Sequence, residues 1–293
     1  MIALLRSPGS HWMEQVASDA KGAVCLLELD AALTGGGLVI TPNSALWQGV
    51  ELTQMEAVIS ERPWFAWPQA TLASSTSAER RIAEREARAL SLSALHVAAE
   101  RTRVMQPLGA AALAVAPLTA LDVCAAAGLD VRAWRLVAAR PSSPAAPWFD
   151  LVGADAWTAP RTPEVGQPAW HPEPFDGAVS SLLVVGDEFV GARGYADADA
   201  WQAARAADGA PEISPNARKI AQIARRALGV DWLQIDLLDA PSGAQVLAAH
   251  VGPDLAAWDR DLRGSVARAF AALLAKLPEA PPAKSLSKDT APR

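Results

Sequence analysis

Lysine is scarce in this chain of 293 residues. Of its 26 basic residues only five are lysines, and three of these lie in the last 18 residues. They are Lys21, Lys219, Lys276, Lys284 and Lys288. Because lysine binds phosphate as a point charge, the main part of the chain cannot supply several phosphate-binding lysines. Mechanisms that depend on them are therefore disfavoured.

Cysteine is also scarce, and long apolar runs are missing. The two cysteines, Cys25 and Cys124, are too few for a disulfide scaffold or a thiolate zinc site, and we expect both to be small buried apolar side chains. No apolar run reaches 18 residues, which predicts no membrane helix. The charge and turn residues in MIALLRSPGS come too early for a signal peptide. We therefore expect a cytoplasmic protein.

The bulk composition narrows the function classes further. A net charge of −6 argues against wrapping nucleic acid. Apolar residues make up 51% of the chain, enough to build large cores and to exclude a disordered protein. The excess of arginine over lysine, together with abundant alanine, is typical of a GC-rich bacterial genome.

The first hundred residues alternate short apolar runs with helical segments. Residues 2–6, 23–29 and 37–41 read as strands, and residues 10–20 read as a helix. This alternation predicts a parallel, Rossmann-like α/β unit. Residues 52–60 fit either a helix or a strand, and Thr76 with Glu79 forms a capping box that opens a long helix.

The second half is predicted to be mixed. Residues 140–175 contain eight prolines and indicate a long loop or a reduced structural element. We expect the tryptophans in and beside this segment to pin it to the core. Flanking it, the pattern predicts strands at 131–137, 178–186, 189–192, 230–238 and 245–251, and helices at 120–127, 214–229 and 265–277. Residues 278–293 form a Pro- and Lys-rich tail that we expect to be disordered.

Three segments of this second half resemble ATP-grasp ligases, in the branch with glutathione synthetase and the ribosomal-protein glutamate ligase. They are MQPLGAAALAVAPLTALDVCAAAGLDVRAWRLV, SSLLVVGDEFVGARGY and the segment that begins ALGVDWLQIDLLDAPSGAQVLAAHV. The resemblance implies an α/β (α+β) chain in three parts. Residues 1–100 would form a Rossmann-like domain, residues 101–277 a two-lobed ATP-grasp-like domain with a reduced 140–175 segment, and residues 278–293 the tail.

The resemblance also implies a chemistry, in which a carboxylate is activated as an acyl phosphate and attacked by an amine. The family places two lysines and an arginine on the phosphates. Here the first lysine position falls at Ala116 or Pro117, and the arginine position at Ser181. The second lysine position falls in the proline-rich stretch 138–175, which contains no lysine, and there we expect Arg140 to be the cation that could substitute.

The family's metal ligands follow an Asp, then Glu-x-Asn, on a strand hairpin. The Asp position is Asp236, while the other two fall at Ala248 and His250, which share a strand face because side chains alternate. A histidine can ligate metals, yet Mg²⁺ prefers oxygen ligands. Candidate metal residues are therefore Asp236 and His250, and candidate nucleotide residues are Arg140 and Arg193, with no catalytic residue assigned.

The spacing of the family's motifs is preserved, while the residue types at its phosphate and metal positions are mostly lost. This combination predicts a bacterial pseudoenzyme that acts as a binding or accessory subunit in a biosynthetic or modification pathway. We expect no cofactor, a protein or peptide partner, and neither nucleic acid nor membrane; a homo-oligomer stays open. One alternative is a working ligase that binds ATP and Mg²⁺ through Arg140, Arg193 or Lys219 and through Asp236 with Asp254 or Glu188. Another is a structural α/β domain whose likeness to the family is coincidental.

Overall fold

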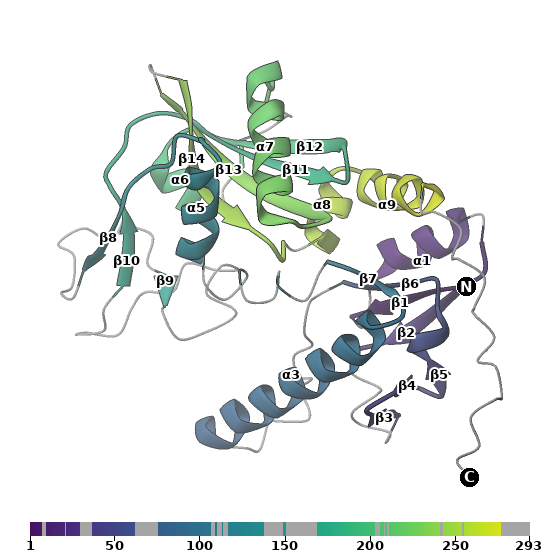
Figure 1. Cartoon of the computed structure of the whole chain (residues 1–293). Helices are drawn as coiled ribbons and strands as arrows, with labels where there is room; N and C mark the ends of the chain where they lie inside the picture. The colour runs from purple at the N-terminus through teal and green to yellow at the C-terminus, as the bar shows by residue number, and fades with distance from the viewer. Residues whose placement is uncertain are drawn as a thin grey trace, which may run out of the picture.

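Two four-stranded sheets, two smaller sheets and the helices around them make up the described part of the chain in a computed structural model (Figure 1). The structure describes residues 1–7, 10–20, 22–29, 37–61, 76–106, 109, 113, 117–137, 149–150, 169–202, 206–207, 209, 211–240, 243–253 and 255–276. Within these ranges no helix has the length and apolar content needed to cross a bilayer.

The first sheet is parallel, as the sequence predicts. Its strands run in the order β2-β1-β6-β7, with bounds Val24–Glu28, Ile2–Arg6, Ala57–Ser60 and Arg103–Met105. Helix α1 (His11–Asp19) packs on one face and α3 (Ser77–Ala99) on the other. The expected capping box is present at the start of α3, where the Thr76 hydroxyl accepts a hydrogen bond from the Glu79 backbone N–H.

A strand expected near 37–41 is present but belongs to a separate antiparallel meander. This meander contains β3 (Leu38–Thr41), β4 (Ser44–Trp47) and β5 (Val50–Glu51). Gln48 and Gly49 both have positive φ at the second turn, and such tight turns join antiparallel neighbours. The ambiguous segment 52–60 divides into the 3₁₀ turn η1 (Leu52–Gln54) and strand β6.

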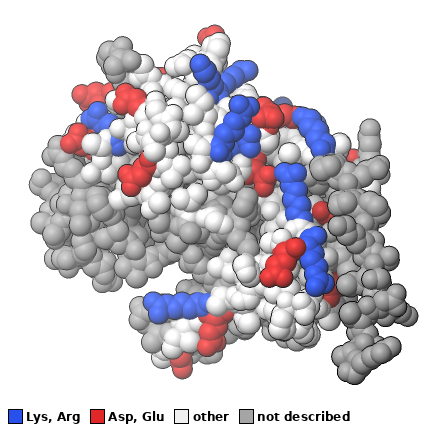
Figure 2. Space-filling model, viewed as in Figure 1, with Lys and Arg blue, Asp and Glu red and all other residues white. Residues whose placement is uncertain are grey.

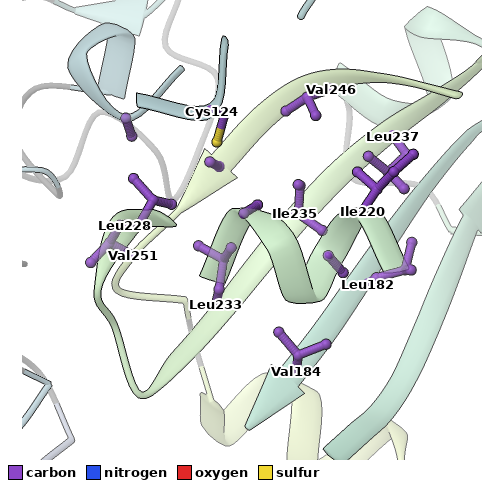
Figure 3. Close-up of a cluster of buried hydrophobic side chains, with 14 of the residues drawn as sticks. Cys124, Leu182, Val184, Ile220, Leu228, Leu233, Ile235, Leu237, Val246 and Val251 are labelled. Carbon is purple, nitrogen blue, oxygen red and sulfur yellow. The ribbon is translucent and has the colours of Figure 1, made fainter. Parts of the chain in front are cut away.

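The second sheet is antiparallel, with the order β12-β11-β13-β14. These strands span Glu188–Tyr195, Val179–Val185, Trp232–Ala240 and Gly243–His250. Helices α5 (Pro117–Ala126) and α7 (Pro215–Leu228) cover one face, over the apolar cluster of Figure 3. Cys124 is fully buried in that cluster, as expected, whereas Cys25 is only half-buried.

Helix α7 begins and ends where the sequence predicts. The Ser214 hydroxyl accepts from the Ala217 N–H, Pro215 opens the helix, and Gly229 closes it with a φ of 64°. Three shorter helices complete the second half: α6 (Ala198–Gln202), α8 (Leu255–Asp261) and α9 (Ser265–Ala275).

A small antiparallel sheet with the order β8-β10-β9 includes parts of the proline-rich region. Its strands are β8 (Trp134–Val137), β10 (Ala169–Pro172) and β9 (Phe149–Asp150). The Trp134 indole donates to the backbone oxygen of Leu247 at 3.1 Å, so this tryptophan ties β8 to β14. Trp148 and Trp157 lie outside the described residues.

One apolar cluster joins the two halves of the chain. Trp12 of α1 packs on Phe270 of α9, and Phe270 packs on Trp232 of β13, each with ring centroids 5.0 Å apart. Buried residues of β1, β6 and β7 belong to the same cluster as buried residues of β11. The parallel sheet and the antiparallel sheet are therefore packed through α1 and α9 (Figure 1).

Candidate functional site

The two faces of the second sheet differ in chemistry. Leu182, Val184, Leu233, Ile235 and Leu237 face α5 and α7. Because strand side chains alternate, their neighbours face the other way. These neighbours include the polar side chains Ser181 on β11, Gln234 and Asp236 on β13, and His250 on β14.

Asp236 is the centre of this polar face, with 1% of its surface exposed. Its Oδ1 accepts hydrogen bonds from the Ser181 hydroxyl at 2.5 Å and the Gln234 amide at 3.1 Å. Its Oδ2 accepts from the Trp201 indole at 2.9 Å and lies 2.8 Å from Nε2 of His250. Each carboxylate oxygen thus has two partners from the chain itself.

The charge state of Asp236 follows from these contacts. Burial by itself raises the pKa of a carboxyl group, because it penalises the charged form. Here the electrostatic attraction and hydrogen bond of His250, with the hydrogen bonds from Ser181 and Trp201, outweigh burial and hold the pKa of Asp236 below its ordinary value. The site therefore favours a buried carboxylate anion.

Arg193 lies on the same face, one strand beyond Ser181. Its guanidinium stacks 4.0 Å from the ring centroid of Trp258 and pairs with Asp261 at 2.6 Å. The Trp258 indole donates to the Gln234 side-chain oxygen at 2.8 Å, which links this pair to the Asp236 network. Arg193 is thereby held by a carboxylate and an aromatic ring on either side.

Two tryptophans from outside the sheet fill this face. Trp201 comes from α6, the short helix after β12, and Trp258 comes from α8, which follows β14. Both are buried and both point an indole N–H at a polar side chain of β13. Neither tryptophan was predicted as a site residue, because the residues next to a tryptophan in a short amphipathic segment do not indicate which distant side chain its indole N–H will contact.

Comparisons with known proteins identify the fold. No protein-family model matches the sequence, and neither does any curated protein. The ATP-grasp ligase PsnB, solved with precursor peptide PsnA2 and AMPPNP, matches with a TM-score of 0.65 and 16% identity, over 93% of this chain and 97% of that chain. Macrocyclase MdnC from Microcystis aeruginosa MRC, bound to precursor peptide MdnA, matches with a TM-score of 0.67 and 12% identity, over 94% and 99%. The chain has the ATP-grasp fold.

A third solved structure agrees with this assignment. The RiPP-associated ATP-grasp ligase of Chryseobacterium gregarium, in complex with ADP and a leader and core peptide, has a TM-score of 0.63 at 11% identity, over 94% of this chain and 96% of that chain. The expected fold class is confirmed by these matches.

The predicted site residues of the ATP-grasp fold divide into three groups. Arg193, Asp236 and His250 lie on one face of the second sheet, together with Ser181 and Ala248. Lys219 lies on α7, across the sheet from them, and Glu188 pairs with Lys276 at the start of β12. Ala116, Arg140 and Asp254 lie outside the described residues.

The residues at the expected metal positions do not fit a magnesium ion. Asp236 already accepts two hydrogen bonds at each oxygen, Ala248 carries only a methyl group, and His250 offers nitrogen. Among the described residues, no group of three or more His, Cys, Asp and Glu side chains could hold a metal. The Asp236 carboxylate is instead saturated by hydrogen bonds from the chain itself, whereas the buried Nε of Arg193 on the same face has no hydrogen-bond partner among the described residues.

Proposed function

We propose that this chain is a binding protein of the ATP-grasp fold that serves a peptide-modification pathway and does not carry out ATP-dependent ligation. One observation carries the proposal: the carboxylate at the expected metal position is saturated by Ser181, Gln234, Trp201 and His250. Displacing these donors for an ion would leave several buried polar groups without partners, at about 1–3 kcal/mol each.

The loss of cations on the same face supports the proposal. Phosphate oxygens must be neutralised before a carboxylate can approach them. Ser181 stands at the family's arginine position, and Arg193 is engaged with Asp261 and Trp258. Lys219 is separated from this face by the sheet.

A peptide is the partner class that the similar structures favour. PsnB and MdnC were solved with precursor peptides, and the Chryseobacterium gregarium ligase with a leader and core peptide. We infer that this chain keeps the peptide-holding part of such a role, as a binding or accessory subunit beside an active enzyme.

The competing function is an active carboxylate–amine ligase with a rearranged nucleotide site. The observation in its favour is that two of the three similar structures contain a nucleotide, AMPPNP or ADP. Among the described residues, Arg193 is the candidate cation that lies on the Asp236 face. The alternative therefore assigns phosphate binding to Arg193.

Nucleotide titration separates the two functions. A ligand present at a hundredfold excess over its Kd stabilises the folded state by about 2.7 kcal/mol, which raises the Tm of a chain of this size by roughly 5 °C or more. We expect no shift of Tm with ATP and Mg²⁺ and no saturable heat in calorimetry.

Micromolar nucleotide binding would overturn the proposal. Arg193→Ala should then abolish it, and Arg226→Ala, on the opposite face, should leave it unchanged. Release of ADP in the presence of candidate peptides would establish the ligase.

A further inference from the structure

Helix α7 presents an outward face rich in positive charge. Its sequence, PNARKIAQIARRAL, contains four basic residues and no acidic residue, in a chain whose net charge is −6. The buried side of the helix is apolar and packs on the second sheet (Figure 3). Figure 2 shows Lys and Arg side chains gathered over α7 and toward α9. The positive charge is therefore concentrated on the solvent side of one element.

Nearby carboxylates neutralise only part of this charge. Asp187, in the β11–β12 turn, pairs with Arg225 at 3.2 Å and with Arg226 at 3.1 Å. Glu188 pairs with Lys276 at 3.1 Å. Including the two remaining basic residues of the helix, Arg218 and Lys219, the surface has five cations against two carboxylates. We call these five residues, Arg218, Lys219, Arg225, Arg226 and Lys276, the basic surface.

The members of the basic surface differ in availability. Arg225 is only 14% exposed and donates to the Val230 backbone oxygen, so its role is structural. The guanidinium of Arg218 is held 4.5 Å from the ring centroid of Phe189. Lys219 is exposed, and the Arg226 side chain is 67% exposed. Lys219 is thus free to meet a partner, and Arg226 can meet one by exchanging its exposed pairing with Asp187.

Helical spacing sets these two cations in one line. Residues 219 and 226 are two turns apart, about 10 Å along the axis at 1.5 Å per residue. Ile223 lies between them on the same stripe and is half-buried. A polyproline II chain advances about 3.1 Å per residue with three residues per turn, so side chains three positions apart lie on one face about 9 Å apart. Acidic side chains three positions apart in such a chain match the spacing of Lys219 and Arg226 along this stripe.

We propose that the basic surface is the docking site for an acidic segment of a peptide partner. The inference rests on the proposed peptide-binding function and adds the chemistry of the segment. A short peptide senses mainly charges within the Debye length, about 8 Å at physiological ionic strength, where cations are in excess. A long polyanion such as nucleic acid would also meet the negative remainder of the chain.

Peptide binding to the full chain provides the test. The probe is a fluorescent synthetic peptide with an aspartate at every third position and leucines between, measured by anisotropy at low ionic strength. We expect saturable binding that weakens with added salt. The double variant Lys219→Glu, Arg226→Glu should weaken it at least tenfold.

The matched control is Arg85→Glu, Arg101→Glu, which changes the net charge equally at exposed positions on α3 and just beyond it. This control should keep affinity within about twofold of the original chain. Circular dichroism confirms that both variants fold.

Several outcomes would overturn the inference. They are an absence of peptide binding, equal losses in both double variants, or tighter binding of single-stranded DNA or anionic vesicles than of the peptide. Concentration-dependent self-association abolished by Lys219→Glu would assign the surface to a second copy instead. The nucleotide titration distinguishes this inference from the proposed function. If the chain binds nucleotide and the peptide still docks, only the proposed function is contradicted. If the chain binds neither nucleotide nor the peptide, only this inference is contradicted.

Discussion

At the scale of single residues, Asp236 is defined by the hydrogen bonds that surround its carboxylate. Its four donors come from four different elements, namely β11, β13, α6 and β14. Such a carboxylate is a structural anchor, because each donor fixes the element that carries it. Removing it would leave the buried donors of Ser181 and Trp201, and the partly buried side chains of Gln234 and His250, without this acceptor.

The first prediction follows from this anchor. Asp236→Ala should lower the free energy of unfolding by about 3 kcal/mol or more, because each buried donor left without a partner costs about 1–3 kcal/mol. Urea denaturation followed by circular dichroism measures it. Asp239→Ala, at an exposed position of the same strand, should stay within about 0.5 kcal/mol. Equal stabilities of the two variants would contradict an anchoring role.

The second prediction concerns pH. Because the pKa of Asp236 is lower in the folded chain than its ordinary value of 3.8, its stabilising contribution is present above that value and is lost as pH falls through the folded pKa. The part of the stability difference between the original chain and Asp236→Asn that comes from the Asp236 charge should therefore shrink below about pH 4. Urea midpoints measured above and below this pH test it. A difference that grows on acidification would refute the assigned direction.

At the scale of elements, residues at the helix ends decide where helices of this chain begin and end. Gly229 closes α7 in the left-handed region, and a Cβ placed there would meet no atom within 4 Å. Only backbone strain therefore opposes a side chain at this position. The helix matters for function in our proposal because it carries the basic surface.

The third prediction isolates that strain. Gly229→Ala should cost about 1–2 kcal/mol, since an L-residue resists the left-handed conformation. The matched control is Gly22→Ala, an exposed position that also has open space but no positive φ, so the change should be neutral or slightly stabilising. Thermal unfolding of both variants gives the comparison. Similar losses in both would mean that conformation at Gly229 is not the cause.

At the scale of the whole molecule, the parallel and antiparallel sheets are joined by more than a linker. Gln106 follows β7 and is buried; its side-chain amide donates to the backbone oxygens of Trp232, at 3.2 Å, and Val251. Its side-chain oxygen accepts from the Asp231 backbone N–H at 3.1 Å. With the cluster around Trp12 and Phe270, this contact couples the two sheets.

The fourth prediction is that the described parts of both halves unfold together. Tryptophan fluorescence and far-ultraviolet circular dichroism should give coincident urea transitions. Gln106→Ala should lower stability by about 2 kcal/mol or more, because buried backbone groups lose their partners, while the exposed Gln54→Ala should not. Two separate transitions in the original chain would show that the halves are independent domains, as the expected division near residue 100 allows.

Sequence reasoning succeeded where structure is local. The Thr76–Glu79 box, the Ser214-Pro215 start and the Gly229 stop are decided within one helical turn, and each was predicted. It failed where partners are distant or where a face must be assigned. Lys219 was offered for the nucleotide site, yet the structure places it across the sheet from Asp236.

The sequence by itself determined the alternating elements and the strand faces that Asp236 shares with Gln234 and Ala248 shares with His250, because strand and helix periodicities are properties of short segments. The ATP-grasp likeness came from three segments of the second half. Only the tertiary structure decided what surrounds these faces. Trp201 is 35 residues from Asp236 along the chain, and Trp258 is 24 residues from Gln234. No local pattern encodes such contacts, since they form when elements separated by turns and helices pack onto one sheet.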